Sequence, residues 1–162
     1  VGAMIKAGIA DPKRVCIVGA SYGGYAALAG ATLTPDLYKC AVSIAGPADL
    51  QLLLNRQGAH WEYSYQYWLR SIGQDSAAIA EHSPRLHADR ITAPVLLIHG
   101  ELDETVLIRQ SELMQQALNS AGHQTRLIRI PDENHYWDTW SDEHRLTVFQ
   151  EMDQFLAQNL GH

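Results

Sequence analysis

Four short segments, the first three of them mostly apolar, constrain the fold of this chain most strongly, because each has the pattern of a strand. They are Val15 to Val18, Cys40 to Ala45, Val95 to His99 and Thr125 to Ile130. Runs that stay apolar at consecutive positions are typical of strands covered on both faces. The segments between the runs have helical patterns, and strands that alternate with helices form a mostly parallel sheet with helices on both faces. The sequence therefore predicts an α/β fold.

The predicted helices lie before, between and after these strands. They are Val1 to Ala7, Tyr25 to Thr32, Ser111 to Ala121 and a last helix that follows Ser141. Ser141 is a good N-cap, and the two acidic residues after it favour the positive end of the helix dipole. We expect the core-facing stripe of this last helix to consist of Leu146, Phe149, Phe155 and Leu156, which follow a helical spacing.

The composition fits a single domain over residues 1–162, with 46% apolar and 19% charged residues. A chain of this length typically buries about 70% of its surface on folding. The net charge is −6 and no cluster of Lys and Arg is present, so we expect no nucleic acid partner. The apolar runs are far shorter than the roughly 20 residues of a membrane span, so we expect no membrane partner.

One glycine-rich turn carries the strongest chemical signal. It reads Gly-Ala-Ser-Tyr-Gly from Gly19 to Gly23 and matches the nucleophile-elbow pattern G-x-S-x-G between a strand and a helix. Such a turn strains the backbone at Ser21 and exposes its hydroxyl, and a Cβ at Gly19 or Gly23 is expected to clash. The following helix directs its first amides at the site, so the Tyr22 N–H is the predicted oxyanion donor. Ser21 is the predicted nucleophile.

A serine hydroxyl needs a base, and His135 is the predicted one. It lies in the loop after the fourth strand, and the site of an open parallel sheet lies beyond the carboxyl ends of its strands. The other seven histidines fall in strands, helices, the segment 49–90, the wrong end of the sheet or the terminus: His60, His82, His87, His99, His123, His144 and His162.

The acid that orients this base is predicted to be Asp103. It follows the third strand at the same end of the sheet, and it precedes the histidine in the chain. Glu101 and Glu104 are its neighbours, but a turn that begins at Gly100 would point them elsewhere. Asp49, after the second strand, remains an alternative. Together these residues predict a serine hydrolase.

The cysteines and the metal-binding residue types give weaker expectations. Cys16 and Cys40 both fall in or beside predicted buried strands, and we expect two free thiols packed in the core, with a disulfide as the alternative. Neither H-E-x-x-H nor a paired Cys/His spacing occurs in the sequence. We therefore expect no metal and no cofactor.

Several strings along the whole chain resemble the catalytic domain of the prolyl oligopeptidase family, which includes dipeptidyl peptidases and acylaminoacyl peptidases. They are Asp11 to Val15, Gly19 to Tyr25, Ser83-Pro84, Ala93 to Gly100, Asp103, Gln110-Ser111 and Glu133 to His135. The resemblance implies the C-terminal half of an α/β-hydrolase fold, with a helical, aromatic-rich insertion at residues 49–90. It also implies hydrolysis of peptide bonds. A departure from the family pattern is Leu107, where relatives usually have proline.

The same resemblance extends, more weakly, to the substrate pocket. Trp61, Tyr63 and the tyrosines that follow, Tyr65 among them, resemble a stretch that lines the pocket for the residue before the scissile bond in dipeptidyl peptidases. Aromatic runs more often pack in a core, so both interpretations stand.

Partners and alternatives follow from what the family carries before this segment, a β-propeller and the first half of the hydrolase sheet. That half normally supplies a second oxyanion donor and covers the strand Val15 to Val18. We expect this strand to pair instead with a missing N-terminal half or with a homodimer partner, since an open apolar edge is a liability. The expected substrate is a peptide or an ester. A carboxylesterase and a non-catalytic fragment that lacks a complete oxyanion hole remain alternatives to the peptidase.

Overall fold

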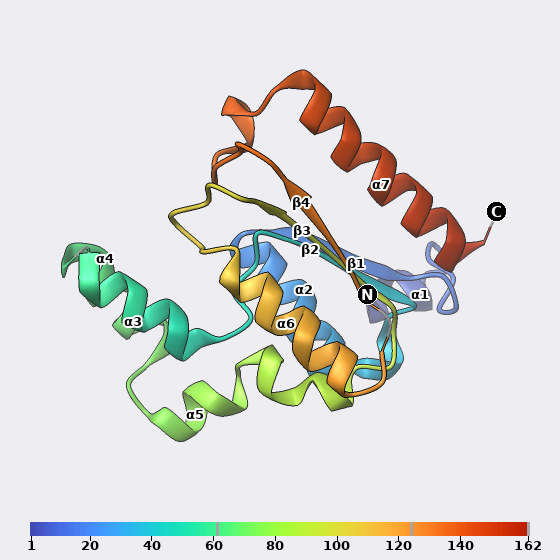
Figure 1. Ribbon diagram of the computed structural model, residues 1–162. Coiled ribbons are helices and arrows are strands. Elements are labelled where there is room, and N and C mark those ends of the chain that lie inside the picture. The colour runs from blue at the N-terminus through green and yellow to red at the C-terminus, as the bar shows by residue number, and fades with distance from the viewer. Residues whose placement is uncertain (61, 124, 162) are drawn as a thin grey trace.

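The computed structural model describes residues 1–60, 62–123 and 125–161. Its centre is a parallel sheet in which four strands lie in the order of the sequence, β1 (Cys16–Ala20), β2 (Cys40–Ile44), β3 (Val95–Gly100) and β4 (Thr125–Ile130). All four strands were predicted, with bounds that differ by no more than two residues. Because the strands are parallel, their carboxyl ends meet at one edge of the sheet (Figure 1).

The helices cover the sheet on both faces. α2 (Tyr22–Leu33) and α6 (Arg109–Ser120) pack on one face, and α7 (Asp142–Leu160) crosses the other (Figure 1). The shorter elements are α1 (Gly2–Lys6) and the 3₁₀ turns η1 (Pro35–Leu37) and η3 (Trp137–Thr139). Side chains of β3 alternate between the two faces of the sheet. Leu97 packs in the core under α2 and α6, and Leu96 packs in the core under α7. No helix among the described residues combines the length and apolar character needed to cross a membrane.

The predicted core stripe of α7 is half wrong. Phe155 and Leu156 pack against the sheet as expected, but Leu146 and Phe149 are more than half exposed. Val148 is fully buried in their place. The helix is therefore rotated from the predicted orientation, and Phe149 instead meets the ring of Trp137 edge-on.

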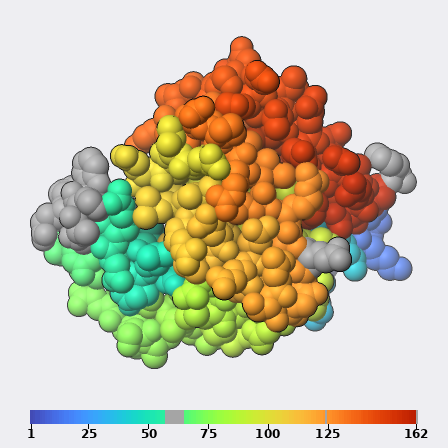
Figure 2. Space-filling view, in the orientation of Figure 1, coloured from blue at the N-terminus to red at the C-terminus, as the bar shows by residue number. Residues whose placement is uncertain are grey.

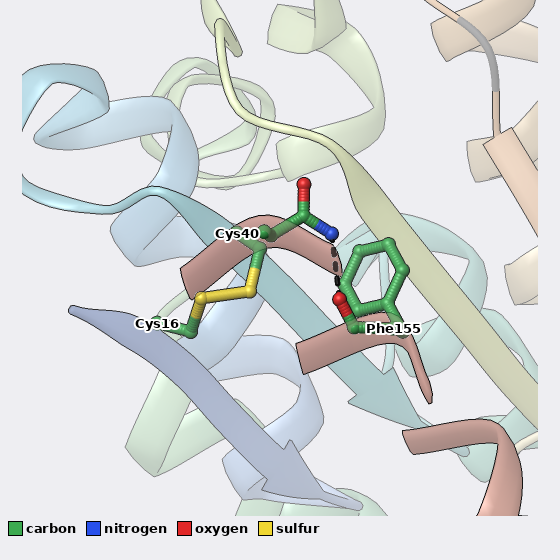
Figure 3. Close-up of a disulfide and its surroundings, with 4 residues drawn as sticks. Cys16, Cys40 and Phe155 are labelled. Carbon is green, nitrogen blue, oxygen red and sulfur yellow. Dashed lines mark hydrogen bonds between the residues drawn. A yellow bond between two sulfur atoms is a disulfide. The ribbon is translucent and has the colours of Figure 1, made fainter. Parts of the chain in front are cut away.

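The predicted free thiols are also wrong, because Cys16 and Cys40 form a disulfide. The two residues are direct register partners on the adjacent strands β1 and β2, with their Cα atoms 4.7 Å apart. Disulfides typically join Cα atoms about 4.4–6.8 Å apart, so the pairing of the strands brings these cysteines within bonding reach. Phe155 of α7 lies beside the disulfide (Figure 3).

The segment between β2 and β3 contains four helical elements. They are α3 (Leu50–His60), α4 (Glu62–Ile72), α5 (Ser76–Glu81) and the 3₁₀ segment η2 (Pro84–Arg90). α3 and α4 extend beyond the carboxyl end of the sheet (Figure 1). The later part of the segment, η2, packs against α6, and the two lie side by side on the surface in Figure 2.

Gln110, at the start of α6, holds the beginning of this segment. Its side-chain carbonyl accepts the backbone N–H groups of Ala48 and Asp49 at 2.9 and 2.7 Å. Its amide donates to the Asp49 carbonyl at 2.9 Å. Gln110 is almost fully buried, so these bonds are made out of contact with water and fix where the segment leaves the sheet.

Candidate active site

Ser21 lies at the sharp turn between β1 and α2, in the strained conformation that the sequence predicts. Its φ is 55° and its ψ is −119°, in a region that non-glycine residues rarely adopt. The turn is held on both sides, because the Ser21 amide donates to the Ile44 carbonyl at 2.8 Å and the Ser21 carbonyl accepts from Tyr25 at 3.0 Å. Strain of this kind is kept only where surrounding bonds impose it.

The glycines at the turn have different roles from those predicted. A Cβ on Gly19 would lie 2.1 Å from the Gly23 carbonyl oxygen, so glycine is required there. A Cβ on Gly23 would meet nothing within 4 Å, so the predicted clash at this position is wrong. The second close approach is at Gly24, where a Cβ would lie 2.8 Å from the Gly46 Cα atom.

His135 is placed between Ser21 and Asp103. The Ser21 Oγ and His135 Nε2 atoms are 2.9 Å apart, and His135 Nδ1 lies 2.6 Å from Asp103 Oδ2. An ionised carboxylate can only accept, so Nδ1 carries the proton in this bond. In the neutral ring Nε2 is then unprotonated and able to accept the serine proton. The three side chains predicted from separate loops meet in one hydrogen-bonded chain.

Asp103 is held as a buried carboxylate. Its Oδ1 accepts the amides of Thr105 and Val106 at 2.9 and 2.8 Å, and its side chain is fully buried. Burial raises the pKa of Asp103, but the hydrogen bonds from His135, His99 and Val106 outweigh it and lower the pKa from 3.8 to about 2. Asp103 is therefore ionised at neutral pH.

The alternative acid, Asp49, is engaged elsewhere. Its Oδ2 accepts from the Arg85 guanidinium at 2.9 and 2.5 Å, and its Oδ1 accepts the Leu52 amide at 2.9 Å. It closes the first turn of α3 instead of contacting His135. The structure thus places Asp103, and not Asp49, against the histidine.

The loop that carries His135 is fixed by its two preceding residues, a feature that sequence reasoning missed. The Glu133 carboxylate accepts from the Ser141 amide at 2.9 Å and from His144 Nδ1 at 2.7 Å, which ties the loop to the start of α7. The Asn134 side chain accepts the Tyr136 amide at 2.7 Å. The string Glu133 to His135 could have indicated this, since each residue before the histidine can accept a bond from the loop backbone.

Tyr22 is the first residue of α2, directly after the nucleophile. The first amides of a helix have no partner inside the helix and lie at its positive end. The Tyr22 N–H is therefore one of these unpartnered helix donors, and it follows the nucleophile Ser21 directly in the chain.

A cavity of about 740 Å³ opens beside the serine. Its lining is mainly aromatic and aliphatic and comes from the turn after β1, from residues 47–82 and from the loop after β3: Ser21, Tyr22, Tyr25, Pro47, Leu50, Leu53, Tyr67, Trp68, Ser71, Ile72, Ala78, His82, Thr105 and Val106. This volume lies within the range of about 300–1,000 Å³ that is usual for ligand pockets.

The predicted pocket residues fare differently. Tyr65 packs against the cluster of Leu50, Leu54 and Ile79. Tyr67, another of the tyrosines that follow Tyr63, lines the cavity together with Trp68. Trp61 and the side chain of Tyr63 lie outside the described part of the structure. Among the described residues no group of three or more His, Cys, Asp and Glu side chains could hold a metal ion.

The family follows from a comparison of the whole chain. A family model described as the prolyl oligopeptidase family matches residues 1–162. The chain belongs to the prolyl oligopeptidase family. The resemblance seen in the sequence is thereby confirmed.

Curated relatives in this family include dipeptidyl aminopeptidase BIII of Pseudoxanthomonas mexicana, 32% identical over 97% of this chain and 23% of that protein. A second is dipeptidyl peptidase family member 6 of Caenorhabditis elegans, 29% identical over 97% of this chain and 22% of that protein. The chain thus spans less than a quarter of the length of these prolyl oligopeptidase relatives.

Solved structures agree with this assignment. A puromycin-hydrolyzing peptidase of Mycobacterium tuberculosis superposes with a TM-score of 0.90 at 33% identity, over 99% of this chain and 24% of that one. An acylaminoacyl peptidase superposes with a TM-score of 0.86 at 23% identity, over 98% of this chain and 26% of that one, which supports the fold alone. The predicted α/β-hydrolase fold is confirmed for this member of the prolyl oligopeptidase family.

Proposed function

We propose that this chain is the catalytic part of a serine peptidase, which cleaves peptide bonds through an acyl-enzyme on Ser21. The observation that carries the proposal is the hydrogen-bonded chain from Ser21 Oγ to His135 Nε2 and from His135 Nδ1 to Asp103. A base that touches the hydroxyl and an acid that fixes its tautomer are the parts that this chemistry requires.

In the proposed reaction, His135 Nε2 takes the proton of Ser21 as Oγ attacks the carbonyl carbon of the scissile bond. The Tyr22 N–H stabilises the negative charge that develops on the carbonyl oxygen. His135 then gives the proton to the leaving amine, and an ester between Oγ and the acyl group remains. Water hydrolyses this ester by the same steps, and Asp103 stays ionised throughout.

The cavity beside Ser21 supports an apolar side chain on the acyl part of the substrate. Tyr67, Trp68 and Ile72 line it with aromatic and aliphatic surface, and fully burying a large apolar side chain is typically worth about 1.5–3 kcal/mol. We therefore propose peptides with a bulky apolar residue before the scissile bond as the preferred substrates. Peptides with a charged residue there would leave that charge unpaired in the cavity.

The first experiment is labelling with a fluorophosphonate probe, which reacts with activated serines. We expect the wild-type chain to be labelled and the Ser21→Ala and His135→Ala variants to remain unlabelled. Ser120→Ala, at the end of α6, and His123→Ala, at the amino end of β4, are the matched controls and should be labelled normally. A folded wild-type chain that resists the probe would contradict the proposal and leave the non-catalytic fragment as the better interpretation.

Relative rates then separate the peptidase from a carboxylesterase on the same fold. Both hydrolyse a nitrophenyl ester, because its leaving group departs without a proton. Only a peptidase hydrolyses the matching anilide or peptide amide, which needs the proton from His135. Turnover of the ester with none of the amide would favour the esterase.

We also propose that another strand pairs with the free edge of β1, supplied by an N-terminal part of a longer chain or by a second copy. β1 ends the sheet order, and Val18 on it is 47% exposed. Native edges of this kind are usually covered. Light scattering would detect a dimer, and Val18→Lys should dissociate it. A stable monomer whose β1 amides exchange as slowly as those of β2 would contradict both forms of the proposal.

A further inference from the structure

A second histidine, His99, contacts the same Asp103 oxygen that bonds His135. It is the fifth residue of β3 and is fully buried. Its Nε2 atom lies 2.7 Å from the Val106 carbonyl oxygen and 3.4 Å from Asp103 Oδ2. Its Nδ1 atom lies 2.7 Å from Ser111 Oγ at the start of α6. Both ring nitrogens are therefore engaged.

The partners assign the protons on the ring. A carbonyl oxygen can only accept, so Nε2 carries a proton and donates it towards Val106. In the neutral ring Nδ1 then accepts from the Ser111 hydroxyl. The Nε2–H group consequently faces Asp103 Oδ2 as well, which is the same oxygen that accepts from His135.

Packing alone does not account for a histidine at this position. The four preceding residues of β3 are Val95, Leu96, Leu97 and Ile98, and all of them are buried. An aliphatic residue would fill the same strand face without the cost of removing an imidazole from water, which typically amounts to a few kcal/mol if its bonds are unmade. His99 makes its bonds, and each partner belongs to the loop or helix that follows Asp103.

We propose that His99 is a positioning residue for the acid of the triad, an inference that rests on the proposed function. With its ring fixed by Ser111, His99 keeps Asp103 Oδ2 aimed at His135 Nδ1. Asp103 is the titratable partner of His99, and His135 faces that carboxylate from the loop after β4. Val106 and Ser111, from the loop after β3 and from α6, are its neutral partners.

Two substitutions at position 99 separate positioning from packing. His99→Phe keeps a ring but removes both bonds, whereas His99→Gln keeps an N–H donor and an acceptor on a smaller side chain. Hydrogen bonds to charged groups are typically worth about tenfold or more in a rate. We expect His99→Phe to react with the fluorophosphonate about tenfold more slowly than wild type, and His99→Gln to stay within about threefold of it. For substrates, the loss should fall on kcat with KM unchanged.

A proton NMR signal supplies a readout that does not need turnover. The proton on His135 Nδ1, which is bonded to the Asp103 carboxylate over 2.6 Å, should resonate far downfield of the backbone amide protons. We expect it in the wild type and in His99→Gln, and broadened by solvent exchange in His99→Phe below its melting temperature. Ser111→Ala, which frees the ring with little change in volume, serves if His99→Phe does not fold, and should broaden the signal in the same way.

The outcomes separate the inference from the function on which it rests. If the resonance behaves as expected but neither the wild type nor any variant reacts with the probe, the positioning role holds and the proposed peptidase fails. If His99→Phe reacts at the wild-type rate with its resonance intact, the positioning role is overturned while the peptidase stands. A loss in His99→Gln as large as in His99→Phe would also overturn it, in favour of packing.

Discussion

His135 and Asp103 come from the loops after two neighbouring strands, β4 and β3, and join at a distance of 2.6 Å between Nδ1 and Oδ2. The parallel pairing of these strands places both loops at the same edge of the sheet, so the contact follows directly from the topology. The backbones of the two loops are also hydrogen-bonded to each other, because the Leu102 amide donates to the Glu133 carbonyl at 2.9 Å.

Asp103→Asn should remove most of the reactivity of Ser21 while leaving the nucleophile in place. An amide at this position favours the wrong histidine tautomer, and such a change typically lowers turnover about 10⁴-fold. Rates of fluorophosphonate labelling measure the loss. Asp49→Asn is the matched control and should cost reactivity less than about tenfold, since Asp49 pairs with Arg85. A larger loss in Asp49→Asn than in Asp103→Asn would reverse the assignment of the acid.

Asp103 should also make stability depend on acid pH. Its pKa is lowered from 3.8 to about 2 in the folded state, so the folded protein binds fewer protons than the unfolded chain in this range. The stabilisation is fully present above about pH 4 and disappears as the pH falls towards 2, a loss of about 2 kcal/mol. Urea unfolding at pH 5 and pH 2.5 measures it. In Asp103→Asn this part of the pH dependence should vanish, and an unchanged dependence would mean that it arises from other groups.

Reduction of the disulfide should destabilise the chain without altering the site. Cys16 and Cys40 are separated by 24 positions, and closing a loop of that size typically contributes about 3 kcal/mol by restricting the unfolded chain. The double variant Cys16→Ala, Cys40→Ala should show a similar decrease in the free energy of unfolding by urea. The wild type in reducing agent should match the double variant, and the reducing agent should not affect the variant. Equal stability of oxidised and reduced wild type would contradict the expectation.

Two glycine variants test the geometry of the turn. Gly19→Ala places a Cβ 2.1 Å from backbone oxygen, which cannot move aside cheaply, so we expect lost labelling and a stability decrease of about 1–3 kcal/mol, as for overpacking. Gly23→Ala adds the same methyl group in open space inside α2 and should be neutral or stabilising by up to about 1 kcal/mol. Thermal melting and labelling distinguish them, and equal damage from both would contradict the steric account.

The strands and the meeting of Ser21, Asp103 and His135 could be predicted because they depend on local signals. A short apolar run between turn signals predicts a strand, and the loops after parallel strands share one edge. The burial predicted for these runs holds for β2 and β3, whereas β1 is only partly buried because it lies at the end of the sheet order. The orientation of α7 could not be predicted in the same way. Leu146 and Phe149 fit a helical stripe as well as Val148 does, and only the position of the helix on the sheet decides between them.

Contacts that depend on the pairing of strands and on the path of the loops could not be predicted from the sequence either. Cys16 and Cys40 meet because β1 and β2 pair in one particular register, which the two sequences do not specify. The sequence excludes His99 as the base because it lies inside a strand, and in the structure Ser21 Oγ bonds His135 while the His99 ring bonds Ser111 and Val106. Its contact with Asp103 depends on how the chain folds back after β3, and no sequence spacing encodes that.

Gln110 and Ser111 are consecutive residues at the start of α6, and they hold different parts of the site. Gln110 binds the backbone where the segment between β2 and β3 begins, whereas Ser111 bonds His99, which contacts Asp103. The hydrogen bonds that Gln110 makes to the described part of that segment go to main-chain groups of Ala48 and Asp49, so they do not depend on which side chains follow. A different segment grafted between β2 and β3 could therefore reshape the pocket and redirect selectivity, while the machinery that activates the serine is inherited unchanged.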